Sequence, residues 1–431
     1  MTSYHGFHPR SPQRGAASLL VTVLLCAALL LATLFSHRGA LLEARLSSQQ
    51  TQSARAFEAA EAGIEWALAQ LNRPEAVDAS CQVAATGTSF RDRHLVAAAA
   101  SAASETAFVP RTWSAAGVAT PQRAACVRAA IGWRCHCPSD APVTLAEAEG
   151  SAIAPAFRIH LETTGAPGVL RLVSTGCTRA TAACLTGGAA PTGTDATARV
   201  QVDLALVPAL LSAPAAPLVA RGDIRSAATL SLVNPDARSG GVVAHSGGAI
   251  DLPQATFETP AGSSLANALA EQDTAFGGQS PDALFVSLFG VAKPLWRELP
   301  MVHRVSCAAS CADELFPAIA QSTGAAQVWV EGDLALSGPL SLGSAERPVV
   351  LVVSGQLALQ GDVQLHGVVY ANGVTWNAAG SAPAALRGAL VSETSYSGDA
   401  PVTLSYDPRV FDTLRQVAGS FVRVPGSWRD F

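Results

Sequence analysis

One uncharged apolar run near the start of the chain constrains this protein more than any other feature. Residues 16–35 read AASLLVTVLLCAALLLATLF, twenty residues without a charge. A helix rises about 1.5 Å per residue, so the run just crosses a hydrocarbon core about 30 Å thick. The alternative is a secretory signal peptide, whose apolar core of about 7–15 residues ends at a small-residue cleavage site. This run is longer and a helical pattern follows it, which predicts a retained transmembrane helix over 16–35.

The charges before this run indicate the orientation of the chain in the membrane, and the overall composition indicates which classes of partner to expect. Arg10 and Arg14 precede the run, so the positive-inside rule predicts a cytoplasmic N-terminus. The 28 basic and 33 acidic residues give a net charge of −5, with no basic excess to follow a phosphate backbone. Nucleic acid is therefore not expected as a partner. A hydrophobic share of 49% argues against a largely disordered chain.

A second, amphipathic helix is predicted directly after the run, over residues 36–72. Good helix formers dominate this segment, and no proline occurs before Pro74. Apolar residues recur in steps of three and four, at Phe57, Ala60, Ile64, Ala67 or Leu68, and Leu71. We expect Phe57, Ile64, Leu68 and Leu71 to pack on the rest of the protein, and the two helices to form one rod that can bend at Gly39.

Beside the apolar stripe, Glu58, Glu61 and Glu65 form an acidic stripe. It is either a docking face for a basic neighbour or a solvated helix face, and charge runs are more often the latter. Glu61 and Glu65 repel each other at a spacing of four residues, so they do not stabilise the isolated helix.

Residues 13–16 (QRGA), the apolar run and residues 56–63 (AFEAAEAG) together resemble the N-terminus of PilX-type minor pilins and pilus assembly proteins of type IV pili. The resemblance covers residues 10–72. It implies that a peptidase cuts after Gly15, that residues 1–15 are a cytoplasmic leader, and that Ala16 becomes the first mature residue. Major pilins carry glutamate at the fifth mature position, where this chain has Leu20; some minor pilins of this type also lack the acid.

Eight of the nine cysteines follow the apolar run. They are Cys81, Cys126, Cys135, Cys137, Cys177, Cys184, Cys307 and Cys311. Outside the cytosol an even set of this kind predicts up to four disulfides. Spacing favours Cys177 with Cys184 and Cys307 with Cys311, and leaves the other pairings open. Cys135-His136-Cys137 could instead be half a metal site, but no second ligand pair accompanies it, so we predict disulfides and no metal.

Residues 73–210 are predicted to form a head. Residues 73–150 are interpreted as variable loops that are cross-linked by disulfides. Alternating residues then predict three strands, around 157–161, 169–173 and 200–206. An antiparallel meander needs a cover for its apolar face, which the helix stripe can supply, and this is also the plan of a pilin. His160 is interpreted as an exposed strand histidine and not as a base or ligand, because no partner motif accompanies it.

Residues 211–405 have a different sequence pattern, with glycines at regular intervals. Gly332 and Gly338 are six residues apart, as are Gly355, Gly361 and Gly367, and GDLALSG and GQLALQG are near copies. This rhythm predicts stacked strand-turn rungs, a β-solenoid-like domain or a bent β-sandwich. The alternative is an ordinary antiparallel sheet with glycine at its turns.

A helical insertion is expected over 253–326, where Ser280 and Pro281 begin a helix. Its aromatic residues Phe285, Phe289 and Trp296 are interpreted as core and not as a binding surface. Residues 406–431 are predicted to form a helix and a closing strand.

No nucleophile elbow, zinc-protease motif, phosphate loop, dinucleotide fingerprint or calcium loop occurs in the sequence. Asp333 and Asp362 in the rungs are interpreted as turn residues. We therefore expect no enzyme and no cofactor. The predicted fold is α+β, mainly β outside the N-terminal helix.

The function implied by the resemblance is that of a structural and assembly component of a type IV pilus. The chain would be anchored in the bacterial inner membrane with a periplasmic head, and would pack on other pilins through its N-terminal helix. A pilus or cell-surface location and a pilus-tip adhesin as partner are further expectations. The alternative is a membrane-tethered surface adhesin outside a pilus. A cell-surface carbohydrate-active enzyme is a third hypothesis, and it lacks the paired carboxylates that it needs.

Overall fold

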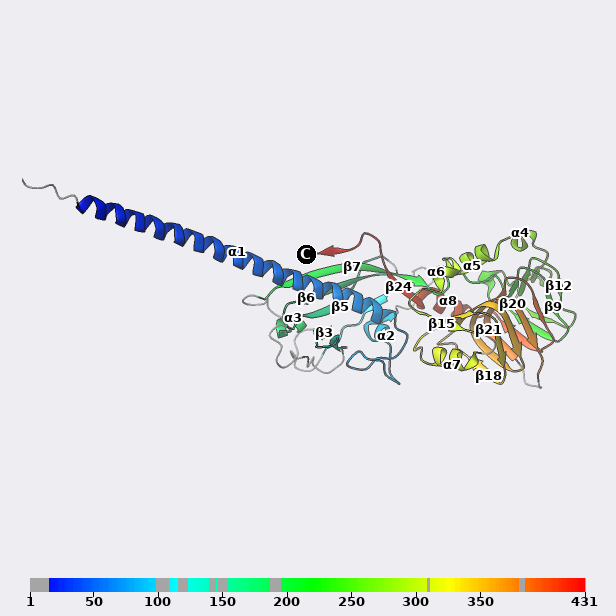
Figure 1. The fold of residues 1–431 in the computed structure, drawn as a ribbon. Coiled ribbons are helices and arrows are strands. Elements are labelled where there is room, and N and C mark those ends of the chain that lie inside the picture. Colours follow the sequence, from blue (N-terminus) through cyan, green and yellow to red (C-terminus); the bar gives the residue numbers. More distant parts are fainter. Residues whose placement is uncertain are drawn as a thin grey trace, which may run out of the picture.

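The computed structural model describes residues 15–97, 108–114, 123–138, 145, 154–166, 168–186, 195–307, 311–379 and 384–430. Three parts follow one another along the molecule (Figure 1): the long helix α1, an antiparallel sheet that α1 crosses, and a stack of parallel strands at the opposite end. We call the sheet with its loops the head, and residues 218–405 the stack. The fold is α+β and mainly β outside α1, as the sequence predicts.

Helix α1 (Gly15–Leu71) is a single helix of 57 residues. The predicted transmembrane helix and its amphipathic extension are therefore one rod, which continues through Gly39. Described side chains of the first half are exposed, whereas one face is buried from Ala56 onward. The helix ends three residues before Pro74, whose ring disfavours continuation of the helix because it removes a backbone donor and clashes with the preceding turn.

The head is a seven-stranded antiparallel sheet in the order β24-β7-β6-β5-β3-β4, with β25 also on β7. Its strands are β3 (Ala124–Arg128), β4 (Trp133–His136), β5 (Ala156–Thr163), β6 (Val169–Cys177), β7 (Thr197–Pro208), β24 (Gly419–Arg423) and β25 (Arg429–Asp430). The three predicted strands are β5, β6 and β7. The head is not confined to residues 73–210, because β24 and β25 come from the end of the chain. The predicted closing strand therefore closes the head, where it covers the free edge of β7.

Sixteen strands form the stack, and all of their described pairings are parallel. An ordinary antiparallel sheet is therefore not what forms. The strands line up in three ladders, because the chain returns to each ladder once per rung. The long strands β19 (Val349–Gln360), β20 (Val363–Asn377) and β21 (Ala384–Ser392) pass from one ladder to the next. The result is a β-rich part of the molecule built from curled parallel sheets.

The remaining strands of the stack are listed by ladder. The first holds β8 (Leu218–Ala220), β11 (Ala244–Ser246), β14 (Leu269–Ala270), β15 (Val302–Ser306) and β16 (Ala326–Glu331); the second holds β9 (Ile224–Ser226), β12 (Ile250–Asp251), β17 (Leu334–Ser337) and β22 (Tyr396–Gly398); the third holds β10 (Leu230–Val233), β13 (Thr256–Glu258), β18 (Leu340–Leu342) and β23 (Val402–Ser405).

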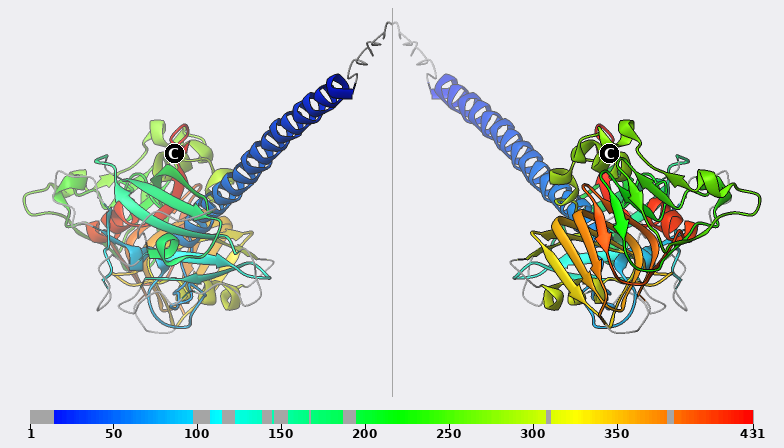
Figure 2. Two further views of the ribbon diagram at one scale, coloured as in Figure 1. Left: turned by 90° about the vertical axis from the view of Figure 1, so that its left-hand side faces the viewer. Right: turned by 90° about the vertical axis from the view of Figure 1, so that its right-hand side faces the viewer.

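The order of rungs in the stack differs from their order in the sequence. The chain enters at β8, in the middle of the stack, and builds outward to β14. It then returns to the other end and builds back from β15, until β21 pairs with β8. Figure 2 shows the green strands from residues 218–233 beside the orange and red strands from residues 384–405. The stack is therefore completed only by the last rung.

Equivalent positions of successive rungs carry apolar side chains that fill the interior. Leu334, Leu357, Val374, Tyr396 and Ile224 follow one another along the second ladder, and all are buried. Burial of such a continuous apolar line stabilises parallel rungs that cannot cover their own faces singly.

Aspartates at the corners connect neighbouring rungs. Asp333 accepts a hydrogen bond from the Gln356 amide at 2.7 Å, and Asp223 accepts one from the Ala249 amide at 3.0 Å. Asp362 accepts instead from the side chain of Gln364. The interpretation of Asp333 and Asp362 as turn residues agrees with these contacts.

The helical insertion is shorter than the expected 253–326, because β13, β14 and β15 within that range continue the ladders. Its helices are α4 (Thr274–Gly277), α5 (Pro281–Phe289), α6 (Lys293–Trp296) and α7 (Ala312–Ala320). Phe285, Phe289 and Trp296 are buried against Tyr370 and Trp329 on the outside of the first ladder, so they are core. At the β15 end, α7 packs Leu315 onto the interior of the stack.

Two chain crossings join the head to the stack. One leads from β7 into β8, and the other leads from β23 through α8 (Pro408–Gln416) into β24. The crossings bond to each other, since the amide of Ala209 donates to the carbonyl of Ala418 at 3.0 Å. Shorter elements complete the chain: α2 (Phe90–His94), α3 (Ala182–Thr186), β1 (Leu95–Ala97), β2 (Phe108–Pro110), η1 (Ala237–Ser239) and η2 (Leu265–Asn267).

Candidate assembly site

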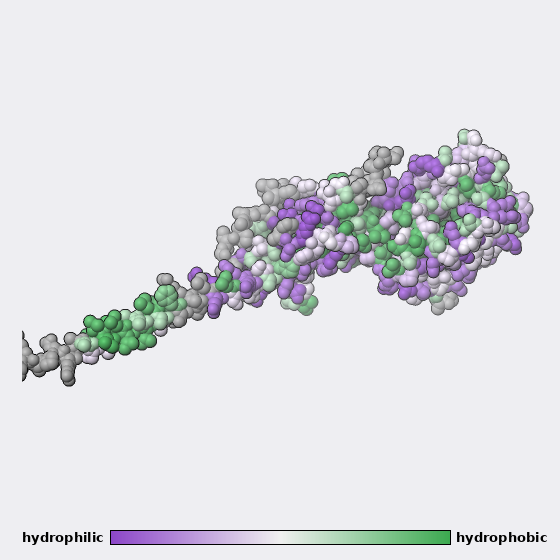
Figure 3. Space-filling model, turned by 90° about the horizontal axis from the view of Figure 1, so that it is seen from above, coloured by the Kyte–Doolittle hydropathy of each residue, from purple (hydrophilic) through white to green (hydrophobic). Residues whose placement is uncertain are grey.

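The first half of α1 is long and apolar enough to cross a membrane. The segment Ala17–Phe35 has a mean hydropathy of 2.6 over 19 residues, and none of it is buried inside the protein. Figure 3 shows it as a green band on the rod, away from the head. Thr22 and Thr33 within it donate their hydroxyls to helix carbonyls at 2.9 Å, which satisfies both groups without water. Exposure and composition are consistent with membrane anchoring.

The proposed processing point lies at the very start of α1. Gly15 is the first helical residue and Ala16 the second. The residues of the leader before Gly15 lie outside the described part of the chain.

The second half of α1 lies on the sheet through small residues. Ala56, Ala60 and Ala67 are fully buried. A Cβ on Gly63 would overlap the hydroxyl of Ser174 and lie 2.9 Å from the ring of Phe157. The glycine of the AFEAAEAG segment therefore sets how closely the helix approaches the sheet. The apolar stripe predicted from the sequence included Ala60 and Ala67 but not Ala56 or Gly63.

The four predicted packing residues divide into two pairs. Ile64 and Leu71 are buried in the head core at 3% and 0% exposure. Phe57 and Leu68 are half-buried and lie at its margin. Phe57 packs against the head core and also makes an edge-to-face contact with Trp428 near the C-terminus, with ring centroids 6.0 Å apart. Its removal is therefore expected to cost less than that of a fully buried ring.

The end of α1 is fastened by the last residues of the chain. We call residues 419–430, which comprise β24, β25 and their turn, the C-terminal strap. Asn72 is buried, and its side chain makes two hydrogen bonds to the backbone of Phe421. The side-chain nitrogen donates to the Phe421 carbonyl at 2.8 Å, and the side-chain oxygen accepts from the Phe421 backbone amide at 2.7 Å. An asparagine at a helix end gave no distinctive signal in the sequence, because its partner is 349 residues away.

Arg91 makes a second connection between α1 and the strap. Its Nε donates to the carbonyl of Leu71 at 3.0 Å and its Nη2 to the carbonyl of Gly419 at 2.8 Å. The guanidinium also lies 4.8 Å from the ring centroid of Phe421. Burial lowers the pKa of Arg91 to about 10, with Asp92 acting in the opposite direction, so the side chain stays charged at neutral pH.

One of the three glutamates of the acidic stripe forms an ion pair within the protein. Glu65 forms an ion pair with Arg423 of the strap. Glu58 and Glu61 are exposed, so both remain solvated in the isolated chain.

All eight predicted cysteines form disulfides. The pairs are Cys81–Cys137, Cys126–Cys135, Cys177–Cys184 and Cys307–Cys311, and Cys26 in the apolar segment is free. Both pairs favoured by spacing are present. Cys135 and Cys137 bond to different partners, so the Cys-His-Cys segment has no thiolates to offer a metal. Among the described residues no group of three or more His, Cys, Asp or Glu side chains could hold a metal ion.

His160 is not the exposed strand histidine that the sequence suggested. It is half-buried on the face of the sheet opposite α1, with Nε2 2.8 Å from Glu162 and Nδ1 3.3 Å from Arg123. Burial and the neighbouring Arg123 lower its pKa, against the opposing effect of Glu162. The cluster is a hydrogen-bonded contact between β5 and Arg123, the residue before β3.

The chain thus has a pilin-like layout, an exposed apolar helix continuous with a helix packed on an antiparallel sheet. Residues 14–65 match the family model described as PilX N-terminal. No curated protein matches the chain. Among solved structures it is similar to the crystal structure of the competence-associated pilin ComZ from Thermus thermophilus, at 13% identity over 88% of this chain and 98% of that chain. The TM-score of this similarity is 0.24. Residues 14–65 are therefore similar to a PilX-type N-terminal region.

Proposed function

We propose that this protein is a PilX-like minor pilin, anchored in the inner membrane and incorporated into or priming a type IV pilus through α1. One observation carries the proposal: a single helix is fully exposed over its apolar half and firmly fastened to the head over its other half. An exposed apolar helix is stable in a bilayer or against other apolar helices, and not in water. The role is structural, without enzymatic activity or a cofactor.

The exposed half of α1 supplies the assembly contact. Ala27, Ala28 and Ala32 are small and exposed, and small residues let apolar helices approach closely where lipid and neighbouring helices compete. The fastened half transmits that contact to the head through Asn72 and Arg91. The partners are other pilins and minor pilins, and the four disulfides fit a periplasmic or external head.

N-terminal sequencing of membrane-extracted protein and of sheared filament fractions tests this proposal. We expect the sequence to begin at Ala16 in both, because processing at Gly15 releases a pilin for assembly. Leu24→Arg places a cation near the bilayer centre at a cost of about 2.5–3.5 kcal/mol, and it should abolish recovery in filaments. Leu46→Arg, on an exposed residue of α1 beyond the apolar segment, is the matched control and should leave membrane anchoring intact.

A membrane-tethered adhesin is the second candidate. The observation that favours it is the large stack at the end of the molecule opposite to the anchor (Figure 1), where it would reach furthest from the membrane. Wild-type protein that stays in the membrane with residues 1–15 attached, and never enters filaments, would contradict the pilin proposal and support this one.

A further inference from the structure

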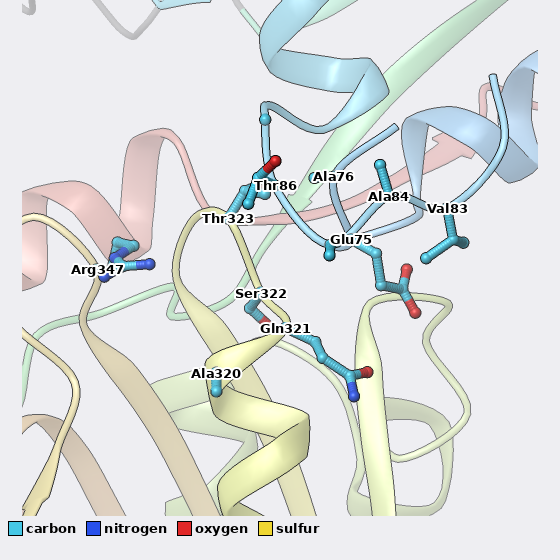
Figure 4. Close-up of a pocket in the computed structure, with 12 residues that line it drawn as sticks. Glu75, Ala76, Val83, Ala84, Thr86, Ala320, Gln321, Ser322, Thr323 and Arg347 are labelled. Carbon is cyan, nitrogen blue, oxygen red and sulfur yellow. The ribbon is translucent and has the colours of Figure 1, made fainter. Parts of the chain in front are cut away.

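A cleft of about 620 Å³ lies between the head and the stack. One wall is the head segment that includes Glu75 and residues 83–87, and the other is the end of α7 with the turn at residues 320–323. Figure 4 shows Glu75 and Gln321 together at one end and Arg347 at the opposite end, with Thr86 and Thr323 between them. The volume is in the usual range of ligand pockets, about 300–1,000 Å³, and such pockets favour domain interfaces.

Both walls of the cleft are braced. The head segment is held at Cys81 by its disulfide to Cys137, and α7 is tied to β15 by Cys307–Cys311. Thr323 joins the walls, because its amide and hydroxyl both donate to the carbonyl of Pro74, at 3.0 and 3.1 Å. A ligand would therefore meet a preformed site and lose little free energy to ordering the protein.

The two ends of the cleft carry opposite charge. Glu75 lies beside the C-terminal end of α7, where helix carbonyls add partial negative charge. Arg347 supplies a guanidinium at the other end. In the part of the chain that the structure describes, neither Glu75 nor Arg347 forms a salt bridge within the protein. The acidic end favours an ammonium or guanidinium group, and the basic end favours a carboxylate.

The residues that line the cleft between its two ends determine which chemical class of ligand fits there. Its side chains are mostly small, as at Ala76, Ala84, Ala85 and Gly87, and none of the lining residues is aromatic. Sugars and nucleobases commonly stack on aromatic rings, so this lining does not favour them. Small side chains instead leave room beside two polypeptide backbones. We propose that the cleft binds a short zwitterionic peptide, with its amino end at Glu75 and its carboxylate at Arg347.

Binding of tetra-alanine to the full-length protein in detergent micelles, measured by isothermal titration calorimetry, tests this proposal. The peptide is used with free ends, with an acetylated N-terminus, with an amidated C-terminus, and with both caps. Each cap should weaken binding about three- to tenfold, as the loss of one charged contact does. Glu75→Gln should abolish the effect of acetylation only, and Arg347→Gln the effect of amidation only.

Two charge-matched controls and one steric variant complete the experiment. Glu314→Gln and Arg387→Gln change exposed residues outside the cleft, and should bind all four peptides like the wild type. Ala84→Trp should fill the cleft and remove binding without altering either charge. No binding of the free peptide, equal binding of the doubly capped peptide, or unchanged binding by Ala84→Trp would overturn the proposal. The outcome does not depend on pilus assembly, because the isolated protein is measured.

Discussion

Gly176 on β6 lies directly beneath α1, where the sheet and the helix backbone are closest. A Cβ at this position would overlap the carbonyl oxygen of Ala56 and the backbone nitrogen of Ala60, and would lie 2.9 Å from the carbonyl carbon of Ala59. All three atoms belong to the helix backbone, so no side-chain rotation can relieve the overlap. Gly176→Ala would require α1 to move away from the sheet by about 1 Å to reach ordinary van der Waals separation.

The expected cost follows from this displacement. Overpacking a well-packed core typically costs about 1–3 kcal/mol, and immovable backbone atoms favour the upper part of that range. For a domain of this size, about 2 kcal/mol corresponds to a fall of roughly 4–8 °C in the melting temperature. Thermal unfolding of the head, followed through the fluorescence of the half-buried Trp66 beside Phe157, measures this change.

Gly324→Ala is the matched control for this substitution. A Cβ on Gly324 would meet no atom within 4 Å, so its melting temperature should stay close to that of the wild type. A Gly176→Ala protein that melts with the control would refute the close approach of α1 to the sheet, and with it the role assigned to the small-residue face.

Three further predictions concern the strap, the histidines and the cysteines. Asn72→Ala leaves the buried amide and carbonyl of Phe421 unpaired, so the head should lose about 1–3 kcal/mol and the Phe421 amide should exchange faster with deuterium; unchanged exchange would show that Asn72 does not hold the strap. Burial, followed by the charge of Arg93, lowers the pKa of His94 to about 3 in the folded protein. Below the ordinary histidine pKa of about 6.5, the unfolded chain therefore binds more protons than the folded protein does. The free energy of unfolding should fall as the pH drops from about 6.5 toward 3. His94→Gln should reduce this slope in urea titrations at pH 7 and 4.5, and an identical slope would contradict the burial of a neutral His94. Alkylation of the denatured, unreduced protein should modify only Cys26, because the other eight cysteines are paired; modification of several sites would contradict the disulfides and the proposed periplasmic head.

The sequence determined the features that depend on neighbouring residues. The apolar run, the helix that follows it and the proline that ends it are local patterns, and α1 extends over the whole of them. The alternation in β5, β6 and β7 and the six-residue glycine rhythm of the rungs are local as well. So are the two disulfides that close the shortest loops, Cys177–Cys184 and Cys307–Cys311.

The tertiary structure decided what depends on partners far away in the chain. Cys81–Cys137 spans 56 residues, and nothing in the spacing of the cysteines distinguishes it from its alternatives. His160 is half-buried and contacts Arg123 only because the fold places β5 beside the residues that begin β3. The entry of the chain into the middle of the stack follows from the pairing of Leu218 with Leu390, since parallel rungs of similar composition can stack in more than one order.

The junction between anchor and head shows this division most clearly. The sequence predicts an apolar stripe on the helix, because helical periodicity appears as a repeat among residues that are close together in the sequence. It does not show that Asn72 and Arg91 hold β24 near the end of the chain, or that Gly63 and Gly176 set the distance between helix and sheet. Asn72, Arg91 and Gly176 act through backbone atoms of distant segments. A backbone carbonyl or amide is present at almost every position, so such contacts leave no pattern in the sequence.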